Sequence, residues 1–286
     1  NYDLFVMPTD GGEAQQLTDH PSMDDHADWS PDGESIAFVS LRDGGFDVYR
    51  MPVPEELQIG PPAEIDYESA GSIPELLVHY DFDRLSPDIT SIPDLGGRHA
   101  LDLVGAHVNS EGDRGWLTFD GEDDHAVVGN ALDLRTAGPI TVAFWVRPAE
   151  AAGNGYLVSK YGWNVYLGSD RIPRFETRTA ANDAWDTLPA AAAIPTGQWT
   201  QIAAVFDNEA NELAIYVNGE LSAERERTDK ALGSTEVHSI QLGQYTAGAS
   251  QQFAGDLDEL RIYSRALPSG EIEQRFEREQ KLVIGE

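Results

Sequence analysis

The chain has 286 residues, contains no cysteine, and carries 19 lysines and arginines against 50 aspartates and glutamates, a formal net charge of −31. The lack of cysteine excludes a disulfide framework, cysteine-ligated zinc and thiol catalysis. The acidic surface argues against nucleic acid and anionic membranes as partners, because their phosphate groups would repel it. No apolar stretch approaches the roughly 20 residues of a membrane helix, so we expect no membrane insertion.

A short motif repeats near the N-terminus. Residues 2–8 (YDLFVMP) return as residues 46–52 (FDVYRMP), an offset that matches the period of a four-stranded propeller blade. Between the copies, residues 28–33 (DWSPDG) form a turn signature before a short apolar strand at 36–40. These motifs resemble the TolB-type repeat of bacterial β-propellers over residues 1–53. The resemblance implies the last blade or blades of a propeller whose remainder lies upstream, because a closed propeller needs at least four blades.

Residues 54–75 differ in composition from the segments on either side. They are rich in proline, glycine and acidic residues and contain no lysine or arginine. Such a composition is typical of a linker. We therefore predict an acidic linker at 54–75 and a second domain over 76–286.

From residue 76 onward, short apolar segments alternate with turn residues such as Asp120-Gly121 and Asn218-Gly219. One helix is expected after Pro268, where Ile272 and Phe276 lie four residues apart. The predicted strands are 76–82, 116–119, 126–128, 140–147, 156–159, 164–168, 174–177, 199–206, 212–217, 222–226, 239–242 and 257–263. A dozen short strands predicts an all-β fold, an antiparallel sandwich of two sheets.

Five motifs in a fixed order make this sandwich recognisable. They are LTFDG at 117–121, ITVAFWVRP at 140–148, GQWTQIA at 197–203, IYVNG at 215–219 and FAGDLDELRIY at 253–263. In this order and spacing they resemble the laminin-G-like, concanavalin-A-like jelly-roll family over about residues 76–279. The resemblance implies a jelly-roll sandwich with a short C-terminal helix.

The sequence offers no pattern of catalytic residues. Retaining glycosidases need two carboxylates about 5–5.5 Å apart, which a strand supplies in an E-x-D-x-x-E pattern. That pattern is absent, and so are a Gly-x-Ser-x-Gly elbow, a Walker loop and a His-Glu-x-x-His helix. We therefore predict no catalytic residue and a protein that is not an enzyme.

Calcium is the metal that an acidic chain of this kind favours, because it takes carboxylate and backbone oxygens as ligands. The family resemblance implies a calcium ion between the start of the domain and its last strand. In this sequence that corresponds to Asp94 and Asp258, with Asp81 and Asp83 as nearby alternatives. The other interpretation is structural: Asp94 caps a turn, and Asp258 pairs with an arginine such as Arg261.

The tryptophans indicate where a ligand could bind. Trp145 and Trp199 lie in apolar motifs, where core packing explains them. Trp163 and Trp185 lie beside glycine and polar residues, and aromatic faces with a few hydrogen-bonding groups suit sugar binding. Alternatively, either ring covers a sheet edge or packs under a loop. The predicted ligand-binding residues are Trp163, Trp185, Asn164, Asp183, Asp186 and Arg178.

These features predict an extracellular, periplasmic or cell-surface module that recognises other molecules without catalysis. Carbohydrate, as a polysaccharide or a glycoprotein glycan, is the expected ligand, with calcium as the expected cofactor. One alternative is an adhesion or scaffolding domain that binds a protein partner. A second alternative is a polysaccharide-active enzyme of the jelly-roll type.

Overall fold

The computed structural model divides the chain into two compact units, residues 1–73 and 74–286. It describes residues 4–6, 15–19, 21, 24–29, 35–40, 47–53, 76–129, 131, 134, 138–150, 153–179, 184–227, 232, 238–248 and 251–284. The expected linker, and the turn at 31–33, lie outside these residues. Within them, no helix is long and apolar enough to cross a membrane.

The N-terminal unit contains two small antiparallel sheets. Strands β1 (Phe5–Val6) and β2 (Gln15–Gln16) form one, and β3 (Asp24–Trp29), β4 (Ser35–Ser40) and β5 (Asp47–Pro52) form the other in sequence order. Ile36 and Phe38 of β4 are buried, as expected for the apolar strand at 36–40. The propeller to which these strands would belong remains a prediction.

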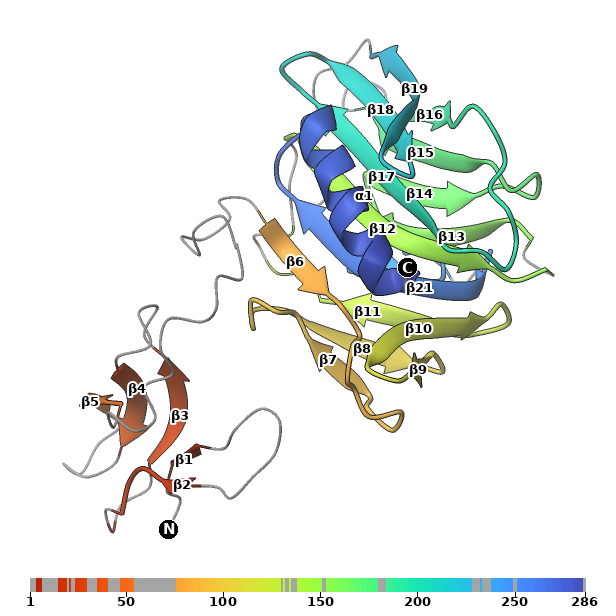
Figure 1. Ribbon diagram of the computed structural model, residues 1–286. Coiled ribbons are helices and arrows are strands. Elements are labelled where there is room, and N and C mark those ends of the chain that lie inside the picture. The colour runs from red at the N-terminus through yellow and green to blue at the C-terminus, as the bar shows by residue number, and fades with distance from the viewer. Residues whose placement is uncertain are drawn as a thin grey trace. The chain divides into compact units, whose positions relative to one another are not determined.

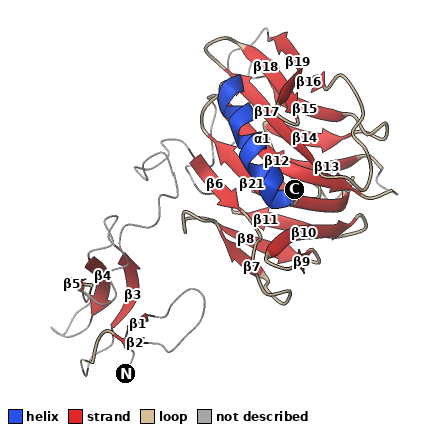
Figure 2. Cartoon of the chain, viewed as in Figure 1, coloured by secondary structure: helices blue, strands red, loops and turns tan. Residues whose placement is uncertain are grey.

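The C-terminal unit is a sandwich of two antiparallel eight-stranded sheets, as the sequence predicts (Figures 1 and 2). Sheet I contains, in spatial order, β19 (Glu220–Glu226), β18 (Glu212–Val217), β17 (Thr200–Asp207), β12 (Ile140–Pro148), β21 (Ala254–Tyr263), β10 (Arg114–Asp120) and β9 (His107–Glu111), and β6 (Leu76–Tyr80) also pairs with β21. Sheet II contains β16 (Trp185–Pro189), β15 (Pro173–Arg178), β14 (Trp163–Leu167), β13 (Gly155–Lys160), β20 (Ile240–Leu242), β11 (His125–Val128), β8 (Ala100–Val104) and β7 (Ser91–Pro93).

The core lies between the two sheets because alternate residues of each strand point inward. Phe144 and Val146 of β12 belong to this core, as do Val165 of β14 and Phe175 of β15. Trp145, between Phe144 and Val146, points to the outer face of sheet I and is nevertheless fully buried.

Helix α1 (Ser269–Val283) covers the outer face of sheet I, and Figure 1 shows it lying across that sheet. Its Phe276 stacks on Trp145 with ring centroids 5.6 Å apart. Its Glu279 accepts hydrogen bonds from the indole of Trp145 (3.0 Å) and the guanidinium of Arg261 (2.5 Å). The helix expected after Pro268 is thus confirmed, and its inward-facing side holds a buried ion pair.

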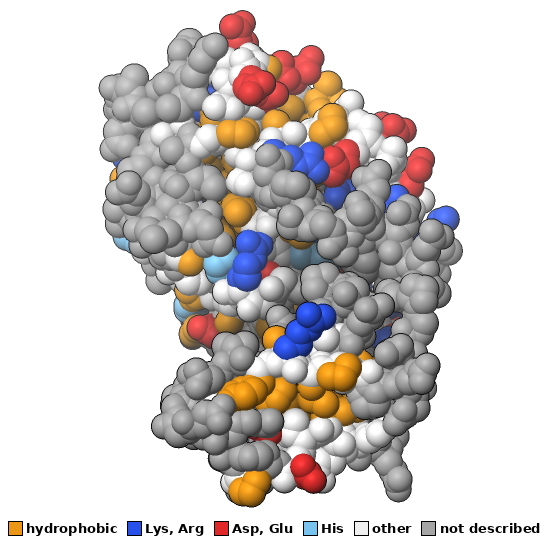
Figure 3. Space-filling model, turned by 90° about the vertical axis from the view of Figure 1, so that its left-hand side faces the viewer, with side chains coloured by type: hydrophobic (Ala, Val, Ile, Leu, Met, Phe, Trp, Pro, Cys, Tyr) orange, Lys and Arg blue, Asp and Glu red, His pale blue; other side chains and the backbone are white. Residues whose placement is uncertain are grey.

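Acidic side chains are unevenly distributed over the sandwich. On the face drawn in Figure 3, they gather at the end where β18 and β19 lie. Strand β19 alone exposes Glu220, Glu224 and Glu226. Burial, the largest effect, raises the pKa of the neighbouring Glu212, and the charges of Glu224 and Asp207 add to the rise. Like charges at this edge favour the protonated form of an acid.

In the described part of the sandwich, four strands were not predicted from the sequence: β7, β8, β9 and β16. Strand β7 is only three residues long, and β8 and β9 are five residues long and mix charged or polar with apolar residues. Strand β16 begins at Trp185, in a stretch whose polar residues indicated a loop. It forms the edge of sheet II, and edge strands need less apolar sequence because water can satisfy one side.

The ion pair beneath α1 gives a prediction about stability. Replacing Glu279 by alanine leaves Arg261 buried without this partner, and breaking such a pair costs about 3 kcal/mol of unfolding free energy. Glu277→Ala, at an exposed position of the same helix, should change stability by less than about 0.5 kcal/mol. Urea denaturation of both variants measures the difference, and equal losses would show that the pair does not anchor the helix.

Candidate functional site

The outer face of sheet II carries a row of polar side chains that crosses five strands. The register pairs Thr187 with Glu176, Glu176 with Asn164, Asn164 with Ser159, and Ser159 with Gln241. Directly paired residues share a face, and the intervening residues of these strands belong to the core. The row therefore lies on the side of the sheet that faces away from the core.

Hydrogen bonds connect this row, and Glu176 is at its centre. Ser159 Oγ donates to Asn164 Oδ1 (2.7 Å), and Asn164 Nδ2 donates to Glu176 Oε1 (2.9 Å). The hydroxyls of Tyr156 and Thr187 donate to the two oxygens of Glu176, both at 3.4 Å. Glu176 is thus a buried carboxylate held in place by neutral donors.

The pKa of Glu176 lies above its ordinary value of 4.5. Burial is the main cause, because it disfavours the charged form, and the three hydrogen bonds oppose it only in part. No second carboxylate contributes to this shift among the groups that the structure describes.

Aromatic side chains lie on both sides of Glu176. On one side, Tyr156 contacts Tyr166 and Tyr245, with ring centroids 5.3 and 4.9 Å apart. We call these three residues the tyrosine cluster. All three side chains are half-buried, so part of each ring faces solvent.

On the other side, Arg178 lies over two rings, 4.2 Å from the centroid of Tyr161 and 5.2 Å from that of Trp185. Tyr161 also contacts His238, with centroids 5.5 Å apart. We call Tyr161, Arg178, Trp185 and His238 the Trp185 cluster. On β15, Arg174 adjoins the tyrosine cluster and Arg178 belongs to the Trp185 cluster. These two arginines are four residues apart, which separates their Cα atoms by about 13 Å along the strand.

The structure brings together only part of the predicted ligand set. Trp185 is 36% exposed and lies beside Arg178, opposite it in register. Asn164 belongs to the same face, but it is buried and donates a hydrogen bond to Glu176. These three residues therefore share one surface, with Asn164 beneath it.

The other predicted residues lie elsewhere. Trp163 is 1% exposed and packs in the core, so its ring is not available to stack on a ligand. Asp186 points to the opposite side of β16 from Trp185, where it pairs with Arg225 and lies 3.6 Å from Arg227 Nε. That pairing ties sheet II to the end of sheet I. Asp183 lies outside the described residues.

The sequence interpretation did not identify Glu176 or the tyrosine cluster, although the sequence contains a signal for them. In residues 163–167 (WNVYL) the apolar residues Trp163, Val165 and Leu167 share one parity, which leaves Asn164 and Tyr166 on the other face. The same parity in residues 174–178 (RFETR) places Glu176 outward, since Phe175 points inward. Alternation alone could thus have placed Asn164, Tyr166 and Glu176 on the outer face of sheet II.

The expected calcium ligands lie in two different environments. Both carboxylate oxygens of Asp94 accept backbone N–H groups of the following turn, from Gly96 (3.0 Å), Arg98 (2.7 Å) and His99 (2.6 Å). Asp94 therefore caps this turn, which is the structural role expected from the sequence as the alternative to calcium binding.

Asp258 is a buried carboxylate that, among the described residues, accepts a hydrogen bond from the adjacent Glu259 N–H alone (2.7 Å). Burial raises its pKa well above 3.8, and the charges of Glu259, Asp83 and Asp81 raise it further. A cation near Asp258 would relieve its repulsion from Glu259, Asp83 and Asp81. Among the described residues, however, the three carboxylates whose oxygens lie within 4.8 Å of one another are Asp120, Asp123 and Asp124, of which the first two are exposed and Asp124 is buried. Asp258, Asp81 and Asp83 do not meet that spacing.

The raised pKa of Glu176 predicts a specific pH dependence of stability. Between pH 4.5 and the folded-state pKa, the folded chain keeps a proton that the unfolded chain releases, so the free energy of unfolding falls as pH rises. Glu176→Gln lacks this titration, and its stability relative to the wild type should increase over that window and then level off. Urea denaturation between about pH 4 and pH 8 measures it, with Glu220→Gln, an exposed glutamate, as the control. Parallel pH profiles of Glu176→Gln and the wild type would contradict the buried charge.

Residues 120–273 match the Laminin_G_3 family, described as the concanavalin A-like lectin/glucanases superfamily. No curated protein sequence matches the chain.

Several solved structures have a similar fold. The binding domain of Paraclostridial Mosquitocidal Protein 1 is 17% identical with a TM-score of 0.58, covering 71% of this chain and 52% of that one. The receptor binding domain of botulinum neurotoxin type G is 15% identical with a TM-score of 0.55, covering 72% and 51%. A structure described as "Cell entry of botulinum neurotoxin type C is dependent upon interaction with two ganglioside molecules" is 12% identical with a TM-score of 0.55, covering 71% and 51%.

This chain spans about half the length of each of those three structures. Identities this low establish a common fold and nothing finer. The family match, in contrast, covers more than half of the 286 residues, and it includes four of the five sequence motifs in full and the last two residues of LTFDG. The chain belongs to the concanavalin A-like lectin/glucanases superfamily.

Proposed function

We propose that the sandwich is a non-catalytic recognition module that binds carbohydrate across the outer face of sheet II. The observation that carries this proposal is the placement of Glu176 between the tyrosine cluster and the Trp185 cluster. Half-buried rings offer apolar faces for stacking on a sugar ring, and Glu176 at the edge of exposure, with half-buried Thr187 and Gln241 at the two ends of the polar row, offers hydrogen-bonding groups for hydroxyls. Two aromatic clusters separated by more than the width of one sugar ring suit an extended glycan.

The arrangement favours binding over hydrolysis. Two-carboxylate hydrolysis needs a second acid close to the first. The described neighbours that shift the pKa of Glu176 are Asn164, Tyr156 and Thr187, all of them neutral. Solved structures of similar fold include a receptor binding domain of botulinum neurotoxin type G and a botulinum neurotoxin type C structure described by its interaction with two ganglioside molecules, which supports recognition as the proposed role. A location outside the cytoplasm is part of the proposal.

Protein binding is the competing function. A structure of similar fold is a botulinum neurotoxin DC binding domain in complex with rat synaptotagmin II, at 11% identity and a TM-score of 0.53. The large apolar residues most exposed on the described sandwich include Leu95, Val104, Leu221 and Leu282, which come from different segments of the chain. Sugar is preferred because the polar row with flanking rings gives a glycan both hydrogen bonds and stacking.

Binding of the full chain to a panel of immobilised polysaccharides tests the proposal. Trp185→Ala and Tyr166→Ala should each weaken binding to the best ligand by about 2 kcal/mol, roughly 30-fold in Kd. Trp185→Ala should leave the melting temperature nearly unchanged because the ring is partly exposed, whereas Trp163→Ala should cost roughly 3–5 kcal/mol of stability.

Val104→Ala is the matched control, because Val104 is a 47% exposed apolar residue of sheet II outside both clusters. Its binding should equal that of the wild type. If Trp185→Ala and Tyr166→Ala bind as tightly as Val104→Ala, the outer face of sheet II is not the binding surface. Release of reducing sugar from the bound polysaccharide would contradict the non-catalytic part of the proposal.

We also propose that calcium stabilises the sandwich at Asp258, whose buried carboxylate is repelled by the charges of Glu259, Asp83 and Asp81. A ligand at a hundredfold excess over its Kd adds about 2.7 kcal/mol of stability, so calcium should raise the melting temperature and EDTA should lower it. Asp258→Asn should abolish this response and, in EDTA at neutral pH, should be more stable than the wild type because it removes a buried charge.

Asp123→Asn separates this site from the carboxylate group at Asp120, Asp123 and Asp124. It should keep the full calcium response. Loss of the response in Asp123→Asn alone would place the ion in the turn after β10. Identical wild-type melting curves in calcium and EDTA would remove the metal altogether.

A further inference from the structure

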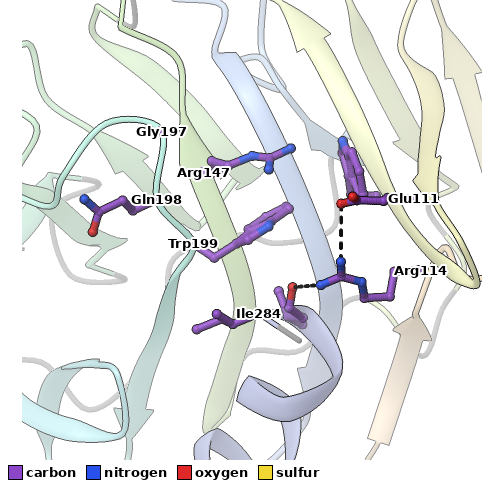
Figure 4. A pocket seen from close by; sticks show the side chains of 9 residues that line it. Glu111, Arg114, Arg147, Gly197, Gln198, Trp199 and Ile284 are labelled. Carbon is purple, nitrogen blue, oxygen red and sulfur yellow. Dashed lines mark hydrogen bonds and ion pairs between the residues drawn. The ribbon is translucent and has the colours of Figure 1, made fainter. Parts of the chain in front are cut away.

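A concave site lies on sheet I, at the end of α1. It is a pocket of about 360 Å³, near the lower end of the range for small-molecule sites. Its walls come from the β9–β10 hairpin, the end of β12, the loop before β17 and the last residues of α1. Figure 4 shows Arg147 and Trp199 on one side of this pocket and Glu111 and Arg114 on the other.

The expectation that Trp199 packs in the core is wrong. Trp199 is half-exposed and lines this pocket together with Trp116, with ring centroids 6.3 Å apart and planes at 73°. Trp199 precedes β17 rather than lying within it, so strand alternation does not direct the ring inward. Two indoles thus form an apolar wall that water can reach.

Arg147 is held in a fixed orientation between these rings. Its guanidinium carbon lies 4.9 Å from the centroid of Trp116 and 4.7 Å from that of Trp199. Its Nε donates to Asp256 Oδ2 (2.8 Å), and Thr118 Oγ1 donates to the other oxygen of Asp256 (2.6 Å). Among the described residues, the terminal amino groups of Arg147 have no hydrogen-bond acceptor. Their N–H groups can therefore donate to a ligand.

A second guanidinium faces the same pocket. Arg114 donates to Glu111 Oε2 and to the backbone oxygen of Val283, both at 3.3 Å, and these bonds are drawn as dashed lines in Figure 4. The side chain of Glu111 is 77% exposed, so its ion pair with Arg114 is weak and a bound carboxylate can replace it. Arg114 and Arg147 are balanced by the carboxylates to which they donate, Glu111 and Asp256, so the pocket lacks the excess of negative charge that the whole chain carries (−31).

We propose that this pocket binds one acidic sugar residue, a pyranose that carries a carboxylate. The carboxylate accepts hydrogen bonds from the terminal amino groups of Arg147 and from Arg114, in the planar geometry that arginine and carboxylate share. The ring lies against the indoles of Trp116 and Trp199. The indole wall favours a sugar over a bare inorganic anion, which would leave that apolar surface unused.

This inference is independent of the function proposed for sheet II. It uses different strands, a different sheet face and none of the residues of the tyrosine or Trp185 clusters. A failure of either proposal therefore leaves the other standing.

Calorimetric titration of the full chain with trigalacturonic acid tests the proposal, and its fully methyl-esterified form is the matched ligand control. The acid should bind saturably and the ester should not, because esterification removes the charge that the two arginines recognise. Arg114→Gln and Arg147→Lys should each weaken binding of the acid by roughly 10- to 30-fold. Arg147→Lys keeps the positive charge but loses the planar fork.

Leu282→Ala, a change at an exposed position of α1 that does not line the pocket, should bind the acid like the wild type. If Arg147→Lys lowers the melting temperature, its weaker binding could reflect unfolding. Arg114→Gln then carries the test, because Arg114 is partly exposed and its replacement should leave the fold intact. Equal binding of acid and ester, no saturable binding of the acid, or wild-type affinity in Arg114→Gln would overturn the proposal. Displacement of trigalacturonic acid by sulfate at equal concentration would show a simple anion site and would also overturn it.

Discussion

The alternation of side chains along each strand determines both the core and the candidate binding surface of the sandwich. On β14 and β15 the inward positions hold Val165 and Phe175, and the outward positions hold Asn164 and Glu176. Because the core needs every inward residue, the register of these strands cannot slip by one residue without exposing the apolar set. The same constraint aligns the polar row across five strands, so the candidate site is as rigid as the core beneath it.

The few cations of this acidic chain are concentrated where they hold rings or buried carboxylates. Arg261 pairs with Glu259 and Glu279 beneath α1, whereas Arg147 and Arg178 lie against aromatic rings at the two candidate sites. Arginine suits these places better than lysine, because its planar group stacks on rings and forms forked hydrogen bonds. Lysine is correspondingly rare in the sequence. With so many surplus carboxylates elsewhere, the arginine-lined surfaces are those that a polar or acidic ligand can approach.

The sequence predicted the sandwich and its C-terminal helix because turn residues and apolar periodicity are local signals. It did not assign the tryptophans correctly, since Trp163 packs in the core and Trp199 lines a pocket. For Trp163, the parity shared with Val165 and Leu167 was available, but the neighbouring glycine suggested a turn. For Trp199, no local signal exists, because its exposure depends on where β9, β10 and α1 end around it. The Trp116–Arg147 contact likewise joins distant strands that sequence spacing alone cannot bring together.

The buried charge of Glu176 connects the stability of the fold to the ligand it could bind. Arg174 and Arg178 flank it on β15, yet Arg174 bonds to Asp170 and Arg178 lies over aromatic rings, and neither contributes to the pKa shift of Glu176. Neutral hydrogen bonds therefore offset only part of the cost of removing this carboxylate from water. A glutamine would fill the same space without that cost, so packing alone does not account for an acid here. Hydroxyl groups of a bound sugar would donate to the carboxylate and favour its charged form, which makes ionisation of Glu176 and glycan binding mutually supportive.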